Sequence, residues 1–276
     1  MIPPRLIATD LDGTLLRDDG TVSERTATAL RDAAAAGIEV VFVTARPPRW
    51  LEPLSEHVAG HGVVICANGA AVVDVATREV LAEHGMTAEL VATIVGRVRA
   101  AWSDAAFATE SAAGFAHERG FSSIHEVPVG SPVADRIEDV LPESSFKLLV
   151  RSPSRPLGTF FEDLAAVVGD LAIVADSGAS GLGEISGQGV TKSATLARWA
   201  ADRGISASEV WAMGDAPNDL SMLTWAGASF AVANAHPSVL AAATHRCGSN
   251  VADGPADVLD LAIARRGAGA PSAPTR

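Results

Sequence analysis

The chain has 276 residues, of which 48% are hydrophobic and 20% are charged; this composition is typical of a folded globular protein and excludes an intrinsically disordered one. Its formal net charge of −12 at pH 7 argues against a nucleic-acid-binding protein, because such proteins normally carry a basic patch. No uncharged segment approaches the roughly 20 apolar residues that cross a bilayer, so we expect no contact with a membrane.

The two cysteines, Cys66 and Cys247, lie far apart in the sequence, which excludes a disulfide framework and a Cys-x-x-Cys site. We therefore expect a reducing, cytoplasmic location. The first ten residues include two prolines and an arginine, so no signal peptide is expected there. A chain of this length forms one large domain or two ordinary ones.

Strand and helix patterns alternate in the first 82 residues. Apolar runs separated by helices are typical of a parallel sheet that is covered on both faces, because each strand then buries both of its sides. The predicted strands are residues 6–9, 38–44 and 63–68; the predicted helices are residues 21–37, capped by Thr21 or Ser23 and ended by Gly37, and a short proline-broken segment after Thr44.

The same alternation returns near residue 190, whereas the segment between is built from shorter pieces with Pro and Ser at the breaks. We predict an α/β fold with a Rossmann-like parallel sheet over residues 1–82 and 188–267, a smaller inserted α/β domain over 83–187, and a disordered tail over 268–276. The insert should hold helices at 88–102 and 160–169 and strands at 146–150 and 171–176; the second half of the core should hold helices at 191–204, 218–227 and 255–266 and strands at 210–213 and 229–235.

Polar side chains follow the predicted core strands at the point where each strand ends. Asp10 and Asp12 follow the first strand, Thr44 ends the second, and Asp215 follows the strand at 210–213. Ligands of open α/β sheets bind at the carboxyl ends of the strands, so we expect these groups to converge. The other candidates are Lys192, at the start of a helix, and Asn218 and Asp219, at the start of the next.

Converging carboxylates need a cation. Two like charges about 5 Å apart repel by about 3 kcal/mol at an effective dielectric constant near 20. Carboxylate and carbonyl oxygens without His or Cys suit a hard cation, and Mg²⁺ is the usual choice beside phosphate. Lys192 and Thr44 supply a positive charge and a hydroxyl donor, which suit a phosphoryl group. The simpler alternative for Asp10 and Asp12 is an acidic turn after a strand.

Four sequence motifs in order resemble the haloacid dehalogenase superfamily of phosphatases, in particular its Cof-like branch with a large type-II cap. They are DLDGTL with Asp10 and Asp12, VFVTAR with Thr44, the single residue Lys192, and GDAPNDLSML with Asp215, Asn218 and Asp219. The resemblance covers about residues 5 to 265 and identifies the inserted domain as the cap. It implies a phosphoric monoester hydrolase for a small phosphorylated metabolite.

The resemblance also implies a role for each motif residue. Asp10 is expected to be the nucleophile that forms an aspartyl-phosphate, and Asp12 the general acid and then the general base. The groups expected at Mg²⁺ are Asp10, the main-chain carbonyl of Asp12, and Asp215; those expected at the phosphate are Leu11, Thr44, Ala45, Lys192 and Asn218; and Asp219 is expected to orient Lys192 or metal-bound water.

Several assignments stay open at this point. A phosphomutase of related architecture and a non-catalytic phosphate-binding protein are alternatives to the phosphatase, and the chain is expected to be a monomer or a homodimer. Asp219 could instead be an acid that favours a helix N-terminus. Possible substrate contacts are Arg46, Asn68, His117 and Arg119, although 114–123 could equally be a solvated hairpin; Trp50, Trp199, Trp211 and Trp225 are expected to be packing residues.

Overall fold

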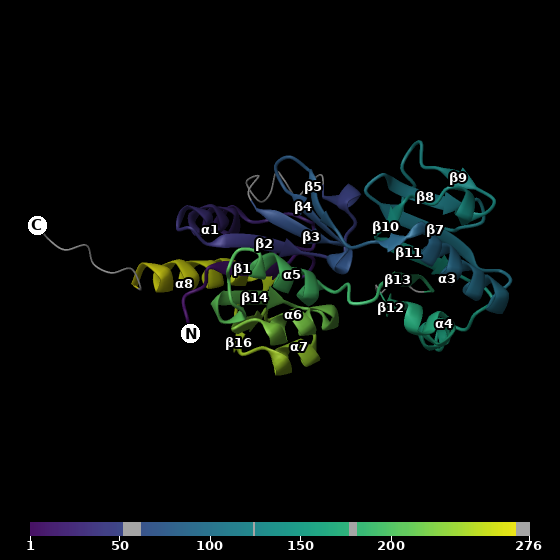
Figure 1. The fold of residues 1–276 in the computed structure, drawn as a ribbon. Coiled ribbons are helices and arrows are strands. Elements are labelled where there is room, and N and C mark those ends of the chain that lie inside the picture. The colour runs from purple at the N-terminus through teal and green to yellow at the C-terminus, as the bar shows by residue number, and fades with distance from the viewer. Residues whose placement is uncertain (52–61, 124, 177–180, 269–276) are drawn as a thin grey trace, which may run out of the picture.

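The computed structural model describes residues 1–51, 62–123, 125–176 and 181–268, and its strands form two large sheets (Figure 1). The eight-stranded sheet has the order β16-β15-β14-β1-β2-β3-β4-β5, in which the strands from β16 to β3 are parallel and β4 and β5 are antiparallel. The strands are β1 (Leu6–Asp10), β2 (Glu39–Val43), β3 (Val63–Cys66), β4 (Ala71–Asp74), β5 (Val80–Glu83), β14 (Val210–Gly214), β15 (Ala228–Ala231) and β16 (His245–Arg246).

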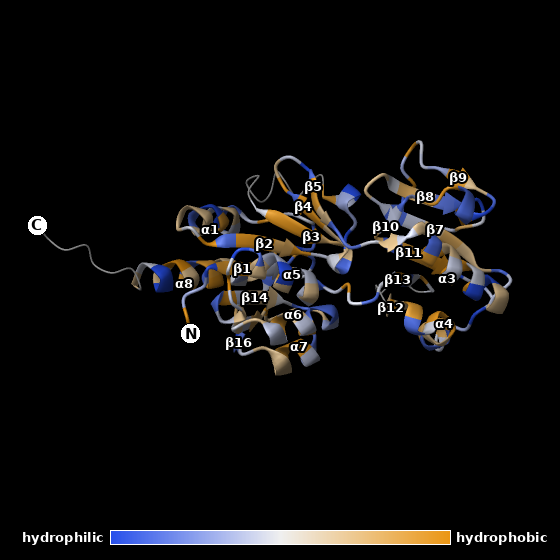
Figure 2. Ribbon diagram, viewed as in Figure 1, coloured by the Kyte–Doolittle hydropathy of each residue, from blue (hydrophilic) through white to orange (hydrophobic). Residues whose placement is uncertain are grey.

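Helices cover both faces of this sheet because its parallel strands are apolar on both sides. Within β1, Ile7 packs with the residues of α1 and α8, whereas Leu6 and Ala8 pack with those of α5, α6 and α7. Figure 2 shows the apolar colour of these strands. The helices are α1 (Glu24–Ala35), α5 (Lys192–Ala201), α6 (Leu220–Trp225), α7 (Pro237–Ala242) and α8 (Gly254–Ala268). We call this sheet and these helices the core domain.

The six-stranded sheet, with the order β12-β13-β11-β7-β8-β9, lies on the other side of the molecule (Figure 1). We call it, with α3, α4 and the short β6–β10 pair, the cap. One cap face is packed under α3 and α4, and the other carries a small apolar cluster. The elements are β6 (Met86–Thr87), α3 (Ala88–Ala101), β7 (Ala106–Ser111), β8 (Gly114–Glu118), β9 (Val133–Ala134), β10 (Ser144–Ser145), β11 (Lys147–Arg151), α4 (Phe160–Val168), β12 (Ala172–Asp176) and β13 (Gly183–Gly187).

The observed elements adjust several details of the sequence prediction. Ser23 rather than Thr21 caps α1, because its side chain accepts a hydrogen bond from the Thr26 N–H. The core sheet continues to Glu83, one residue beyond the predicted boundary, and α8 includes Ala268. The rest of the predicted tail, 269–276, lies outside the described residues, as does most of the short helix predicted after Thr44; its described part is the single turn η1 (Pro48–Trp50).

Two further features concern the length of the helices and the glycine-rich segment at 181–187. Among the helices that the structure describes, none combines the length and the hydropathy needed to cross a membrane. The glycine-rich segment at 181–187 mostly forms β13, a strand between β11 and β12, rather than a phosphate-binding loop.

A glycine in the turn η2 (Ala67–Gly69) lets the core sheet approach the start of α5. Gly69 has φ = +112°, and a Cβ there would lie 2.5 Å from the Thr191 carbonyl oxygen. The Gly69 carbonyl also accepts a 2.8 Å hydrogen bond from the Thr195 hydroxyl. Because Lys192 opens α5, this contact fixes where that lysine enters the site.

We predict that Gly69→Ala lowers the free energy of unfolding by at least about 2 kcal/mol, because the new Cβ adds both a backbone clash and a strained φ. Urea unfolding followed by circular dichroism measures the change. Gly96→Ala is the matched control: Gly96 lies inside α3 with nothing near its would-be Cβ, so alanine should stabilise the protein by about 0.5–1 kcal/mol. Equal effects of the two substitutions would contradict this account.

Candidate functional site

A buried lysine joins two carboxylates at the carboxyl edge of the core sheet. The Lys192 Nζ lies 2.5 Å from Asp10 Oδ1 and 2.7 Å from Asp219 Oδ1. Asp10 ends β1, and Lys192 begins α5, 182 residues later in the sequence. All three side chains are at least 93% buried, and a buried charge is tolerated only when it is paired and hydrogen-bonded.

A third carboxylate, Asp215, completes the cluster. One oxygen from each of Asp10, Asp215 and Asp219 lies within 4.8 Å of the others. Asp215 follows β14, the strand that pairs with β1, and its Oδ1 accepts a 2.9 Å hydrogen bond from the Thr14 hydroxyl. The adjacent parallel strands therefore deliver these acids to one place, as the sequence predicted for ligands of such a sheet.

The cluster carries more negative than positive charge. Burial raises the pKa of the Asp10 carboxyl well above its ordinary value; Lys192 opposes that rise, and Asp219 and Asp215 add to it. Burial likewise raises the pKa of Asp215. Burial alone would lower the pKa of Lys192, but the charges and hydrogen bonds of Asp10 and Asp219 outweigh it, so its pKa is raised and the side chain stays charged. Three carboxylates beside one ammonium leave an excess of about two negative charges.

These residues fit a divalent cation, and two of the three acids are better placed to bind it. Asp219 is already engaged: its Oδ1 binds Lys192, and its Oδ2 accepts hydrogen bonds from the backbone N–H groups of Asp215 and Ala216, each at 3.1 Å. Asp10 and Asp215 each keep one oxygen, Oδ2, that accepts no hydrogen bond from the described residues, and these oxygens are therefore left for a hard cation.

The turn after β1 is packed closely against Asp215. Gly13 has φ = +80°, and a Cβ there would lie 2.5 Å from Asp215 Oδ2. The Gly13 carbonyl accepts a 2.7 Å hydrogen bond from the Asn234 side chain. The Leu11 carbonyl accepts the Leu16 N–H at 2.8 Å within the same turn. Thr14 and Asn234, which hold the turn and Asp215 in place, are not among the residues predicted from the sequence.

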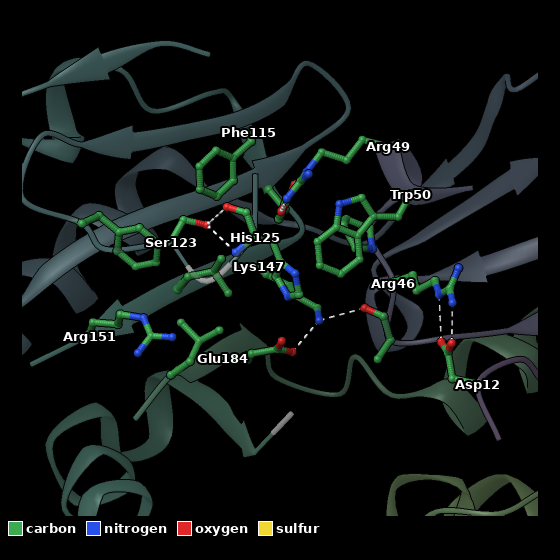
Figure 3. Close-up of a pocket in the computed structure, with 16 residues that line it drawn as sticks. Asp12, Arg46, Arg49, Trp50, Phe115, Ser123, His125, Lys147, Arg151 and Glu184 are labelled. Carbon is green, nitrogen blue, oxygen red and sulfur yellow. Dashed lines mark hydrogen bonds and ion pairs between the residues drawn. The ribbon is translucent and has the colours of Figure 1, made fainter. Parts of the chain in front are cut away.

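Asp12 is not part of this three-acid cluster and is paired with an arginine. Its side chain is 55% exposed, and its two carboxylate oxygens bind Arg46 Nε and Nη2 at 2.9 and 2.5 Å. Arg46 is the last residue of the second motif, so the two motifs meet through this pair (Figure 3). Arg46 is therefore placed beside the Asp12 carboxylate and at a pocket wall.

The loop after β2 is fixed by hydrogen bonds to the turn after β3. Thr44 is fully buried; its hydroxyl accepts the Arg46 N–H at 3.0 Å, and its carbonyl accepts the Asn68 N–H at 3.0 Å. Asn68 has φ = +57°, and its side-chain oxygen is buried with no hydrogen-bond partner among the described residues. Asn218, in the turn η6 (Pro217–Asp219), is exposed.

A pocket of about 730 Å³ lies between the core domain and the cap (Figure 3). Of the residues predicted to contact substrate, Arg46 lines it, whereas His117 and Arg119 do not; Arg119 is exposed and paired with Asp135. Trp50, expected to be a packing residue, also lines it. The core residues of its lining are Asp12, Ala45, Arg46, Pro47, Arg49 and Trp50, and those of the cap are Glu110, Phe115, Phe121, Ser123, His125, Lys147, Leu149, Arg151, Leu182 and Glu184.

Two polar contacts tie the cap to the core across this pocket. The Lys147 Nζ, from β11, donates to the Ala45 carbonyl at 2.9 Å and pairs closely with Glu184. Arg49 binds both carboxylate oxygens of Glu110: its Nη2 lies 2.7 Å from Oε1 and its Nε lies 2.9 Å from Oε2. Burial raises the pKa of Glu110, and Arg49 opposes that rise. The signal for Lys147 was available in the sequence, because this arginine-rich chain has only one other lysine, Lys192.

Comparison with known proteins finds a matching family profile and relatives that are similar over nearly the whole chain. The sequence profile described as haloacid dehalogenase-like hydrolase matches residues 7–259. YxeH of Bacillus subtilis is 30% identical over 275 residues, which span 95% of this chain and 99% of that protein. The 5-amino-6-(5-phospho-D-ribitylamino)uracil phosphatase YbjI of Escherichia coli is 29% identical over 94% of this chain and 96% of that protein.

The fold is likewise similar to solved structures. The crystal structure of a haloacid dehalogenase-like hydrolase from Bacteroides thetaiotaomicron superposes with a TM-score of 0.76. The alignment covers 94% of this chain and 99% of that one at 24% sequence identity. This structural similarity supports the overall fold, which is a Rossmann-like core with a cap.

We predict that Lys192→Met lowers the free energy of unfolding by about 3–5 kcal/mol at pH 8 in the absence of divalent metal, because it leaves Asp10 and Asp219 buried without a cation. Burial already raises the pKa of Asp10, and Lys192 opposes that rise, so without the lysine the folded protein holds a proton on Asp10 more tightly than the unfolded chain does. The loss should therefore be smaller at pH 5 than at pH 8. Urea unfolding at both values, with a chelator present, measures it.

The control for this experiment is an exposed ion pair. Arg119→Met removes a pair whose side chains are 69% and 84% exposed, so the cost should stay below about 1 kcal/mol at both pH values. A Lys192→Met variant with a loss as small as that of the control, or with a loss that does not depend on pH, would show that the lysine does not neutralise the cluster.

Proposed function

The chain belongs to the haloacid dehalogenase-like hydrolase family, and from this premise we propose that it is a magnesium-dependent phosphatase of small phosphorylated metabolites that works through an aspartyl-phosphate. The observation that carries the proposal is the buried bridge from Lys192 to Asp10 and Asp219, with Asp215 beside it. We also propose that the six-stranded domain acts as the cap over this site, with the boundaries predicted from the sequence.

Asp10 is proposed as the nucleophile. Lys192 binds Oδ1 and so holds the carboxylate in one orientation for the attack on phosphorus. The attack forms the Asp10–phosphorus bond while the bond from phosphorus to the leaving ester oxygen breaks. Asp10 must be ionised to attack, and burial opposes ionisation. The positive charge of Lys192 and of a bound cation therefore favours the reactive state.

Asp10, Asp215 and the main-chain carbonyl of Asp12 are proposed to hold Mg²⁺. When bound, the ion neutralises the carboxylates and the developing charge on the phosphoryl oxygens. Thr14 and Gly13 hold Asp215 in place for this role. Asp219 supports the site indirectly, because its two oxygens fix Lys192 and the turn that carries Asp215.

Asp12 is proposed to give a proton to the leaving oxygen and then take one from the attacking water. It lies at the pocket wall, where a leaving group must sit. To donate a proton, the carboxyl must give up at least one of its two hydrogen bonds from Arg46. We therefore assign Arg46 the role of orienting Asp12, and the pair should loosen when an ester enters.

The phosphate contacts are proposed for the backbone around Leu11 and Ala45 and for the side chains of Thr44, Lys192 and Asn218. The cap narrows access to this edge of the sheet and favours small esters over phosphoproteins. The name of the relative YbjI specifies a phosphorylated ribitylaminouracil as its substrate, which is a small metabolite. This agreement supports a small-molecule substrate for the present chain.

We predict that Asp10→Asn abolishes phosphate release from a panel of phosphomonoesters with Mg²⁺, with kcat falling by at least about 10³-fold, because the amide is a far weaker nucleophile. A chelator should abolish the wild-type activity, and added Mg²⁺ should restore it. Inorganic phosphate is measured over time for each substrate.

Asp18→Asn is the matched control, because Asp18 is an exposed acid on the same segment; its activity should equal that of the wild type. Equal slow release by wild type and Asp10→Asn would refute the enzymatic proposal. A phosphomutase would instead convert a sugar 1-phosphate, with a bisphosphate activator present, into the 6-phosphate without net release.

A further inference from the structure

The pocket between the two domains is much larger than a phosphate group. Its volume of about 730 Å³ lies within the range of pockets that enclose cofactor-sized ligands. Asp12 lies on the wall of this pocket, so an ester cleaved there would extend its leaving group toward the cap. The side chains that line the rest of the pocket therefore select the chemistry of that leaving group.

Aromatic rings from both domains line this pocket. Trp50 of the core and His125 of the cap pack edge to face, with ring centroids 4.5 Å apart and an interplanar angle of 74° (Figure 3). The ring centroids of Phe115 and Phe121, both in the cap, lie 6.3 Å apart. The whole chain has five Trp, eight Phe and no Tyr. Three of these thirteen aromatic residues, Trp50, Phe115 and Phe121, line this one pocket, which gives it an unusually large flat and polarisable surface.

The cap side of the pocket also carries an apolar patch beside its polar groups. Phe115, Phe121, Leu149 and Leu182 belong to one apolar cluster, and all four line the pocket. A sugar placed against this patch would bury hydroxyl groups without partners there, which costs free energy for each group. A flat ring would instead gain favourable contact with the aromatic side chains.

Three of the four Arg and Lys side chains that line the pocket are paired with carboxylates. These three offer little net charge to a second anionic group on the substrate. One of these carboxylates, Glu184, can accept a hydrogen bond from a ring N–H, amino or hydroxyl group. The three pairs are Arg46–Asp12, Arg49–Glu110 and Lys147–Glu184.

We propose that the leaving group of the substrate is an uncharged heteroaromatic ring carrying a short alcohol arm, with the ring packed against Trp50 and its polar edge at Glu184. The assignment rests on the proposed phosphatase function and narrows it to one substrate class. Trp50 is then a specificity-determining residue, supplied by the core domain directly after Arg49.

Two esters with the same leaving atom test this substrate class. Pyridoxine 5′-phosphate and ribose 5-phosphate are both monoesters of a primary alcohol, but one carries a heteroaromatic ring and the other a polyol. We expect kcat/KM for the ring ester to exceed that for the sugar ester by at least about tenfold. Calorimetric titration of the Asp10→Asn variant should show the same preference in Kd, independently of turnover.

Substitutions of the aromatic wall separate stacking from general damage. Trp50→Leu should lower the ratio of the two kcat/KM values by about tenfold, whereas Trp50→Phe should retain most of it. Trp225→Leu is the control, because Trp225 packs in the core domain away from the pocket, and it should leave the ratio unchanged. His125→Ala, at an exposed side chain, gives a second test that does not depend on folding of the Trp50 variants.

The outcomes distinguish this inference from the function on which it rests. Release of phosphate from both esters, with ribose 5-phosphate equal or preferred, would overturn the aromatic assignment and leave the phosphatase standing. A ratio that neither Trp50→Leu nor His125→Ala changes would overturn it as well. Release from neither ester, nor from any ester of the wider panel, would overturn the phosphatase proposal and this inference with it.

Discussion

The arrangement of the core domain depends on one ammonium group that is buried between carboxylates. Lys192 contacts Asp10 and Asp219 at salt-bridge distance, and all three are almost entirely removed from solvent. The buried ammonium compensates the charge of the two acids, and the acids compensate the charge of the ammonium. The sheet edge, the start of α5 and the turn before α6 are thus held together by an electrostatic contact as well as by apolar packing.

This contact also explains why the neighbouring glycines and turns take unusual conformations. Gly13 brings the turn after β1 against Asp215, and Gly69 brings the core sheet against the residue before Lys192. Each position excludes a Cβ because a charged or carbonyl oxygen occupies its place. The backbone around the site therefore approaches the acids closely and limits their movement.

The cap adds contacts of a different kind. Lys147 and Arg49 each cross from one domain to the other and are compensated by Glu184 and Glu110. They position the two walls of the pocket, whereas its aromatic and aliphatic side chains supply the surface that a leaving group would touch. Asp10 ends a core strand and Asp215 follows another, whereas most residues that line the pocket belong to the cap, so the proposed chemistry and the proposed substrate selection lie on separate elements.

The sequence by itself determined the parallel core strands β1, β2, β3, β14 and β15, because parallel strands buried on both faces appear as apolar runs; it did not predict β4, β5 or the cap strands β7, β8 and β13. It also indicated which residues to expect at the site, because acids at strand ends and a rare lysine have few structural uses. Tertiary structure alone decided the partners: that Arg46 binds Asp12, that Asp219 is taken up by Lys192, and that Trp50 faces a pocket rather than the core. These contacts join segments that are distant in the sequence or belong to different domains. The order of the core strands and the position of the cap set them, and local periodicity specifies neither.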